Sequence, residues 1–556
     1  MKNRFFKYYI FFFMTIIGLF SCESDEEFLK ENPQTFYTLD NSLSSSNEIE
    51  QVLISCYSQA RSDFGGLELR GKGSDILAVP ERRISASFSD YGRLNPETGT
   101  YNAIYSNFYR LISKANTILY TDENKDIAWT SEEKRKYVIA QAKFFRAFAY
   151  RSLGELYGGV PIVTEIYTTP KYDFERASRI ETYQFAIDDL ESSLNDFPET
   201  TTQGGRIVKG AAQHYLSELY LAMGIESEQQ GQGGDDMYQK AVQYASDVID
   251  GGIYSLMTER FGTRQNHDPG DVYWDLFRRG NVNYQDGNTE CIWAFQKDLD
   301  AFMEEDGDAG LLFPRYYMPA LRTREGFIGI DPEIGARGIA SVAPTKYMTE
   351  TIWNGQIGEG DIRNAEHNIQ RNFYFNDPDY ERYGELAPDS ILHPGEDVGM
   401  VYPIWWKLTT DEFEDVGWPP NSWLFRDEYV IRLPETILLR AEAYWRLGQD
   451  QNAADDINKI RERAQCDYLV TAEDVTRDLI LDERARELFV EERRWNTLLR
   501  MGGTVAVDRI REHNYWPTTV PQSTLTFDFS LWPIPQEQID RNKDNPMPQN
   551  PGWEGR

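Results

Sequence analysis

The chain has 556 residues, of which 40% are hydrophobic, 14% aromatic and 26% charged. This composition is typical of a well-packed soluble protein and excludes a disordered, collagen-like or coiled-coil chain. Aspartate and glutamate number 90 against 57 lysines and arginines, which gives a formal net charge of −33. Such an acidic chain repels phosphate backbones, so nucleic acid is excluded as a partner. Polyanionic polysaccharides are disfavoured for the same reason, unless a local basic patch overrides the average charge.

The first residues are typical of a secretion signal. Lys2, Arg4 and Lys7 precede an apolar run over residues 8–20, which is too short to cross a hydrocarbon core of about 30 Å. The run ends in the sequence LFSC, which resembles a bacterial lipobox. It predicts a signal peptide at residues 1–21 and lipidation of Cys22, so that acyl chains hold the protein at a membrane. An ordinary cleaved signal with an incidental cysteine is the alternative.

An acidic and polar segment follows this cysteine. Residues 23–27 read ESDEE, which resembles the surface-export signal of Gram-negative lipoproteins from glycan-foraging bacteria. Because polar residues and proline continue after it, residues 22–47 are predicted to form a tether. The folded body is then expected at residues 48–556.

Helical patterns dominate the first half of this body. Thr130 and Glu133 fit a capping box, and the helix that they open is predicted to end at the glycine pair before Pro161. Apolar residues at three- and four-residue spacings predict further helices at about residues 179–195 and 209–223 and after the loop 229–236. Helix pairs of this kind are typical of tetratricopeptide repeats and favour a stacked scaffold over an enzyme core.

The pattern changes in the middle of the chain. From about residue 255 to 425 helical periodicity fades, and glycine, proline, asparagine and aromatic residues become frequent. Helical spacing then returns, and the last long stripe, at 479–500, is predicted as one helix. The sequence therefore predicts a mostly α fold in which a helical scaffold, residues 48–254 and 426–556, flanks a loop-rich central insert, residues 255–425. Loops on a rigid scaffold carry most binding sites, so we expect function in the insert.

Five segments carry a family likeness. They are YSNFYRLISKANTIL at 105–119, AQAKFFRAFAYRSLGELYGGVPIV at 140–163, YVIRLPETILLRAEAYWRLG at 429–448, ERARELFVEERRWNTLLR at 483–500 and WPIPQEQIDRNKDNPMPQNPGW at 532–553. In this order, and behind a lipobox, they resemble the SusD/RagB family of outer-membrane nutrient-binding lipoproteins.

The resemblance implies a SusD-like, tetratricopeptide-like fold with about four helix pairs, and it implies binding without catalysis. Members capture oligosaccharides at the cell surface and deliver them to a SusC-like TonB-dependent barrel in the outer membrane. Because the acidic chain disfavours polyanions, we expect a neutral oligosaccharide as the ligand here. Capture of peptides or glycopeptides for the same kind of complex is the alternative. A helical glycosidase and a tetratricopeptide adaptor are competing classes, because paired carboxylates and grooves are invisible in a sequence.

The ligand-binding residues are expected in two places. Sugars stack on aromatic rings and exchange hydrogen bonds with carboxylates, amides and arginine. The resemblance places such groups in two parts of the chain, an early segment at residues 70–96 and the insert. The candidates are Asp75, Arg82, Phe88 and Tyr91 in the early segment and Trp274, Tyr284 and Tyr316 in the insert.

No cofactor is predicted. The acidic run at 298–310 suggests Ca²⁺, but it has no EF-hand spacing of glycine and glutamate, and we interpret it as a solvated loop.

Overall fold

The computed structural model describes residues 42–64, 66–80, 88–304, 307–328, 331, 336–394, 399–417, 420–516 and 520–556. The predicted signal peptide, the lipidation site Cys22 and most of the predicted tether lie outside these ranges. No helix within them is both long and apolar enough to span a bilayer.

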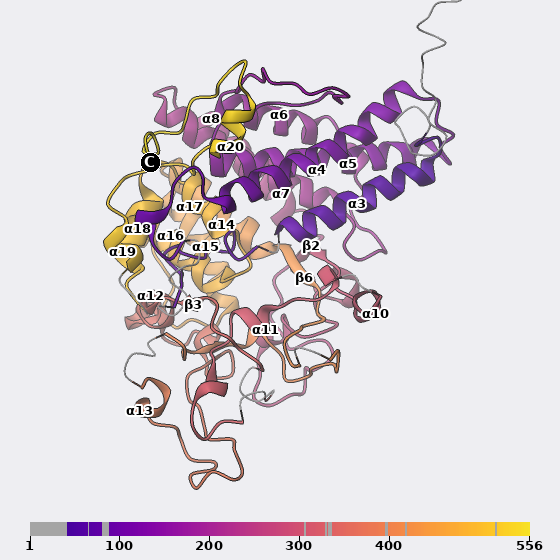
Figure 1. Cartoon of the computed structure of the whole chain (residues 1–556). Coiled ribbons are helices and arrows are strands. Elements are labelled where there is room, and N and C mark those ends of the chain that lie inside the picture. The colour runs from indigo at the N-terminus through magenta and orange to yellow at the C-terminus, as the bar shows by residue number, and fades with distance from the viewer. Residues whose placement is uncertain are drawn as a thin grey trace, which may run out of the picture.

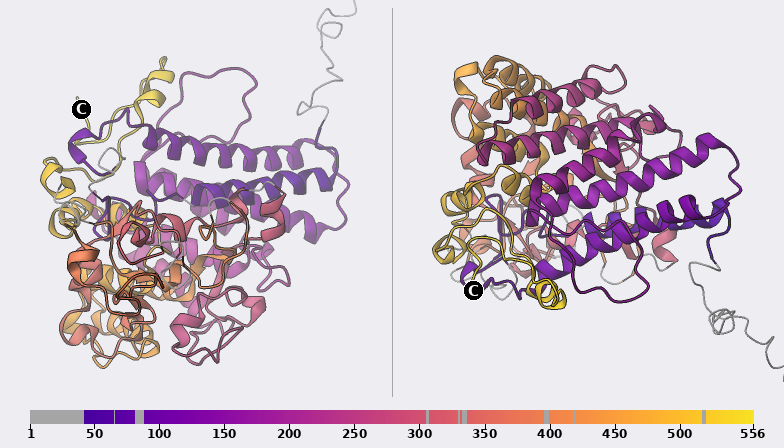
Figure 2. Two further views of the ribbon diagram at one scale, coloured as in Figure 1. Left: turned by 60° about the horizontal axis from the view of Figure 1, so that its bottom comes forward. Right: turned by 90° about the horizontal axis from the view of Figure 1, so that it is seen from above.

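Six helices of the first half pack on one another in chain order, and Figure 1 and the view from above in Figure 2 show them side by side. They are α3 (Ser46–Phe64), α4 (Gly99–Asn124), α5 (Glu132–Tyr157), α6 (Arg179–Glu191), α7 (Lys209–Gln229) and α8 (Asp235–Ile249). Helix α7 lies in the middle of the stack and is buried on nearly every face. This explains why its apolar residues are spread around the helix rather than gathered in one stripe.

The helices after the insert continue the same stack. They are α14 (Leu433–Arg446), α15 (Asp450–Arg463), α16 (Arg477–Leu488), α17 (Arg494–Arg500), α18 (Val505–His513), α19 (Val520–Thr524) and α20 (Gln536–Arg541). Helix α14 packs on α8 and α7, and α17 packs on α5. The two predicted helical regions therefore form one frame, and the mostly α, helix-pair fold is confirmed.

The central insert lies below this frame in Figure 1 and contains only short elements in its described residues. Its helices are α9 (Val272–Asp275), α10 (Leu299–Met303), α11 (Phe313–Tyr316), α12 (Lys346–Thr349) and α13 (Asp389–Leu392). Its strands are β2 (Cys291–Phe295), β3 (Ala343–Pro344), β4 (Ile369–Gln370) and β5 (Ile404–Trp405). Two further strands lie outside the insert, β1 (Leu77–Ala78) in the early segment and β6 (Glu428–Arg432) before α14. The strands pair antiparallel as β1–β3, β2–β6 and β4–β5. Because β6 runs directly into α14, its pairing with β2 ties the insert to the frame.

Two predicted helix boundaries needed correction. The N-cap of α5 is Ser131, whose hydroxyl accepts a hydrogen bond from the Lys134 amide at 3.1 Å, so the predicted cap at Thr130 is wrong by one residue. The predicted helix over 479–500 is two helices, because the backbone turns at Val490 with φ of +65°. This turn is costly for a β-branched residue, and it lets the glutamates that follow point inward.

A buried network of arginines and glutamates surrounds that turn. Arg432 on β6 lies 2.7 Å from Glu290 and 2.6 Å from Glu487 of α16. Arg363 of the insert lies 3.1 Å from the same Glu487 and 2.7 Å from Asp361. All five side chains are almost fully buried. Charges removed from water must be paired, so this network fixes the position of the insert against α16.

The early segment is held by a second group of buried charges around Asp75. This carboxylate is fully buried and lies 2.6 Å from Arg494 and 3.0 Å from Arg509. Burial alone would raise the pKa of Asp75, but the two guanidinium groups outweigh it and hold the pKa well below its ordinary value.

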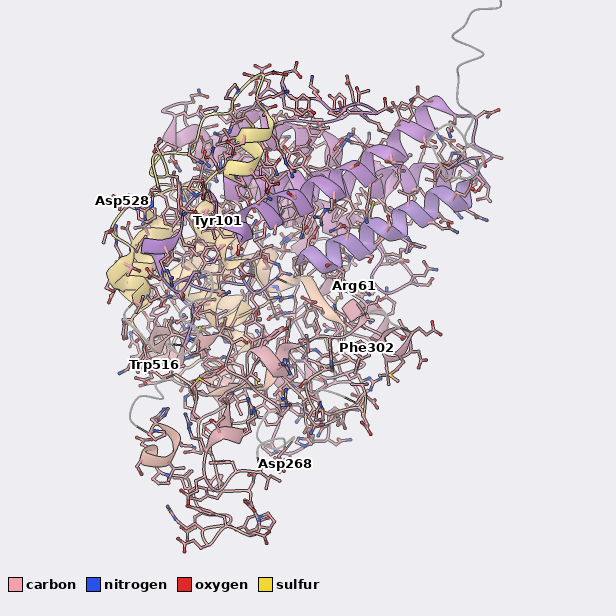
Figure 3. The ribbon with its side chains drawn as sticks, viewed as in Figure 1. Arg61, Tyr101, Asp268, Phe302, Trp516 and Asp528 are labelled. Carbon is pink, nitrogen blue, oxygen red and sulfur yellow. The ribbon has the colours of Figure 1, made fainter. Side chains whose placement is uncertain are left out.

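We expect Asp75→Asn to lower the free energy of unfolding by about 3–5 kcal/mol, because it leaves two buried arginines without their counter-charge. Chemical denaturation measures the change. The matched control is Asp528→Asn, which removes an exposed ion pair with Arg511 and should cost less than about 1 kcal/mol. Figure 3 shows Asp528 at the surface. Equal effects of the two substitutions would contradict the structural role of Asp75.

Glu155 is a buried carboxylate that accepts hydrogen bonds from Arg151 at 2.9 Å and from Asn496 at 2.8 Å. Burial, followed by the neighbouring charge of Glu218, raises its pKa from 4.5 to about 7. The folded state therefore binds this proton more tightly than the unfolded state. The stability that the proton contributes is complete below pH 4.5 and is lost as the pH rises through 7.

Glu155→Gln removes this titration and keeps the shape. We expect the variant to gain stability over the wild type between pH 5 and pH 8, by up to about 3 kcal/mol. Urea denaturation of both proteins at the two pH values measures the change. Glu435, whose pKa burial also raises to about 7, is present in both proteins and cancels. A difference that does not vary with pH would disprove the assignment.

Candidate functional site

The structure brings the early segment and the insert together. Strand β1 pairs with β3, with Ala78 opposite Ala343 and Leu77 opposite Pro344. Residues 81–87, which follow β1 and include the candidate Arg82, lie outside the described ranges. The chain returns to the described part at Phe88.

Three of the early candidates are interior residues. The Asp75 carboxylate forms ion pairs with Arg494 and Arg509. The ring of Phe88 lies 5.4 Å from Trp495 and 5.5 Å from Trp532, and the Tyr91 hydroxyl donates to the Gly73 carbonyl at 2.8 Å. Each of the three is at most 1% exposed. The prediction that they contact a ligand is therefore not compatible with this structure, since a side chain without exposed surface has nothing to offer a sugar.

Two insert candidates lie at other places in the fold. Trp274 is 4% exposed, its ring stacks on His267 at 4.8 Å, and the Arg278 guanidinium lies 4.1 Å from its centre. Tyr284 is half-buried against the helical core, with its ring 5.9 Å from Tyr254. The protein's own residues therefore cover much of both rings, and the structure does not group them with the β1–β3 pair.

Tyr316 does lie beside β3. It is half-buried at the end of α11, and its carbonyl accepts hydrogen bonds from the amides of Ser341 at 3.1 Å and Val342 at 3.4 Å. The segment that makes these bonds also carries Ala340 and Ala343, which belong to a small buried cluster with Ala320, Met400 and Tyr402, and the half-buried Trp516 packs against this cluster. Figure 3 shows Trp516 between the C-terminal helices and the insert. Trp516 was not predicted as a site residue. The only sequence signal at this position is the aromatic pair Tyr515 and Trp516, which follows a helix and directly precedes a proline.

Three arginines surround this segment. The Ile339 amide donates to the Arg315 carbonyl at 3.0 Å, and the Arg322 Nε donates to the Gly338 carbonyl at 3.3 Å. Burial, and then the like charges of Arg315 and Arg322, lower the pKa of Arg337. Arg315 and Arg322 are therefore close enough for their charges to act on Arg337. No spacing pattern in the sequence indicated them. We call Arg315, Tyr316, Arg322, Arg337 and Trp516 the insert junction.

The insert junction has the chemistry of a carbohydrate site. Aromatic rings with exposed area offer apolar faces to the C–H groups of a sugar. Guanidinium groups offer several N–H donors in fixed directions to hydroxyl or carboxylate oxygens. Within the described residues, no cluster of three or more histidine, cysteine, aspartate or glutamate side chains is placed to hold a metal ion.

A second concave surface lies on the helical frame. This groove of about 830 Å³ is formed by α4, the segment 161–174 and α20. Tyr105 and Tyr109 lie in its floor with their ring centres 4.9 Å apart, and the exposed Tyr172 lies at its edge. The groove is a rival site for a ligand because it also combines rings with polar groups.

Two family models match the chain. The model described as "Starch-binding associating with outer membrane" matches residues 27–221, and the model of the SusD family matches residues 421–553. Among curated proteins, SusD-like protein P25 of Formosa agariphila is 25% identical over 94% of this chain and 95% of its own length. Starch-binding protein SusD of Bacteroides thetaiotaomicron is also 25% identical, over 74% of this chain and 72% of its own.

Solved structures agree. A SusD homologue of Bacteroides thetaiotaomicron matches with a TM-score of 0.68 at 19% identity, over 93% of this chain and 98% of that one. A laminarin-binding SusD-like protein matches with a TM-score of 0.64 at 20% identity, over 92% of this chain and 100% of that one. At this identity the matches show a shared fold. Together with the two family models, which cover more than half of the sequence, they show that the chain belongs to the SusD family.

Proposed function

We propose that this protein is a cell-surface lipoprotein that captures oligosaccharides at the insert junction without cleaving them. The observation that carries the proposal is that the segment 337–343, which pairs with the early segment through β3, has Tyr316, Arg315 and Arg322 bonded to its backbone and Trp516 packed on the cluster that it helps to form. The relatives support it, because one is a starch-binding protein and one structural neighbour binds laminarin. Stacking and hydrogen bonding are sufficient for capture and require no catalytic group.

We also propose that the captured glycan passes to a SusC-like TonB-dependent transporter in the outer membrane, and that lipid on Cys22 anchors the protein there. The family description "associating with outer membrane" supports this location. In Figure 1 helix α3 starts at one end of the helix stack, and in Figure 3 Trp516 lies on the opposite side of the same view. A tether at that end leaves the insert junction clear of the anchor.

The capture proposal is tested with Trp516→Ala. Isothermal titration uses a panel of laminari-, malto-, xyloglucan and uronic acid oligosaccharides and a tryptic peptide mixture. We expect five- to tenfold weaker binding of the glycan that the wild type takes, because losing a stacked ring costs roughly 1 kcal/mol or more. Trp516→Phe should keep most of the affinity, which separates the loss of a ring from misfolding.

The matched control is Tyr172→Ala, which removes an exposed ring from the groove between α4 and α20. It should leave glycan binding unchanged. Loss of binding in the groove variant alone would move the site to the groove. Binding of peptides alone would favour the alternative ligand class, and release of shortened glycan, followed by chromatography, would show an enzyme instead.

The anchor is tested separately. We expect Cys22→Ala to move the protein out of the membrane fraction, because Cys22 is the only cysteine in residues 1–55 and is the residue that the lipobox would lipidate. Cell fractionation followed by detection of the protein measures the change, and Cys56→Ala, a buried cysteine of α3, serves as the control. An unchanged distribution would rule out the lipobox interpretation.

A further inference from the structure

Exposed apolar side chains are concentrated at one place in the insert. Ten large apolar side chains are exposed among the described residues, and Ile328, Tyr374, Tyr383 and Leu386 are four of them. Ile328 belongs with the other three because its amide donates to the Asn376 side chain at 3.1 Å. Single exposed apolar residues are common on soluble proteins, but a group of them indicates a binding surface.

Three members of this group lie on an antiparallel hairpin. The Ala387 amide donates to the Phe373 carbonyl at 2.8 Å, and Tyr374 lies directly opposite Leu386. Because successive residues of a strand point to opposite faces, Phe373 and Phe375 are buried in the core of the insert while Tyr374 and Leu386 point to solvent. We call residues 373–387 the insert hairpin.

The two outward tyrosines have no task inside the protein. Within the described residues, the side chains of Tyr374 and Tyr383 form no hydrogen bond and their rings contact no other ring. Tyr380 differs, because it is half-buried and its ring lies 4.8 Å from that of Phe375. The inward residues therefore hold the hairpin, and the faces of the two outward rings are available to a ligand.

The insert hairpin is also acidic. It carries Asp377, Asp379, Glu381 and Glu385 against a single basic residue, Arg382, which lies 2.9 Å from Glu385. Exposed rings offer apolar faces to the C–H groups of a sugar, and carboxylates accept hydrogen bonds from its hydroxyl groups. The same carboxylates repel uronic acids and sulfated sugars at close range. This chemistry suits a neutral sugar.

The size of the surface favours a sugar over a protein partner. A stable protein interface takes roughly 20–30 residues from each side, which is more than the whole hairpin contains. A sugar ring needs only one aromatic face and a few acceptors around it.

The insert hairpin is joined to the insert junction by a short segment. The Gly326 carbonyl accepts hydrogen bonds from the amides of Asn376 at 3.2 Å and Asp377 at 3.1 Å. Arg322 of the junction precedes Gly326 by four residues, so their Cα atoms are at most about 14 Å apart. In Figure 1 helix α13, which directly follows the hairpin, lies at the end of the insert away from the helix stack. The hairpin therefore continues the junction away from the frame.

We infer that the outward face of the insert hairpin is a second carbohydrate subsite, at which Tyr374 and Tyr383 stack on the far part of a neutral glycan whose near part lies at the insert junction. The inference rests on the proposed function and adds the length and charge of its ligand. A chain that is held at the junction makes its second contact as an intramolecular step, so a long chain gains affinity that a short one does not.

The experiment compares the wild type with the double variant Tyr374→Ser, Tyr383→Ser by isothermal titration. The probes are laminari- and malto-oligosaccharides, each as the trisaccharide and the heptasaccharide. In at least one series we expect the wild type to bind the heptasaccharide fivefold or more tightly than the trisaccharide, which corresponds to about 1 kcal/mol. The double variant should lose this preference and keep the affinity for the trisaccharide.

Two control variants separate stacking from other effects. Tyr374→Phe, Tyr383→Phe keeps both rings and should bind like the wild type. Tyr120→Ser removes an exposed ring from α4 and should leave both affinities unchanged. The unfolding temperature of the serine variant should match that of the wild type. A lower unfolding temperature together with weaker binding of both lengths would show that the tyrosines are structural and would overturn the subsite.

The subsite and the proposed capture at the junction fail differently. Trp516→Ala should weaken binding of both lengths, because the junction contacts either chain. Equal binding of both lengths by the wild type and the serine variant, or binding of uronic acid oligosaccharides alone, would overturn the subsite and leave capture standing. A dimer in sedimentation velocity that the serine variant dissociates would assign the hairpin to contacts between two copies and would also overturn it. Binding of no oligosaccharide of any kind would overturn both proposals.

Discussion

The fold depends on the pairing of buried charges around the turn between α16 and α17. Glu487 accepts from arginines of the insert and of β6, while Asp75 of the early segment accepts from Arg494 on α17. Because an unpaired charge in the interior costs several kcal/mol, each of these segments has one position in which all partners are satisfied. Segments far apart in sequence are in this way held in one arrangement, and the insert junction, which adjoins the β1–β3 pair, receives a defined position although it is built from irregular backbone.

The helical frame was predictable and the interior of the early segment was not. Helix α6 begins at Arg179 as its pattern predicts, since Ser178 and Glu181 form a capping box and apolar spacing is a local signal. The single helix predicted over 479–500 failed because its turn is imposed by inward-facing acids, a tertiary cause. Asp75 was predicted in the ligand site because the family resemblance places part of the site in its segment. Its partner, Arg494, lies 419 residues away, and no spacing rule connects two such positions.

The candidate site, like the early segment, could be predicted only in part from the sequence. Tyr316 was predicted from the composition of the insert and does lie beside β3, whereas Trp516 belongs to the C-terminal part and joins the junction by packing on the buried cluster that includes Ala340 and Ala343. The expectation of a neutral ligand came from an average over the whole chain. An average of charge carries no information about which charges lie nearest to a site, and a binding site responds to those, because more distant ones are screened.

The frame maintains the fold, and the junction carries the residues that we propose to bind the ligand. This separation would allow proteins of the same fold to differ in their ligands. Relatives align over nearly the whole chain at about a quarter identity, so most side chains differ while the fold is kept. A frame held by helix packing and paired charges constrains the buried positions. The residues of the insert junction are half-buried or exposed and sit on short elements, so exchanging them costs the frame little. At the site proposed here, a change of ligand would require new side chains at the junction and no change in the stack that supports them.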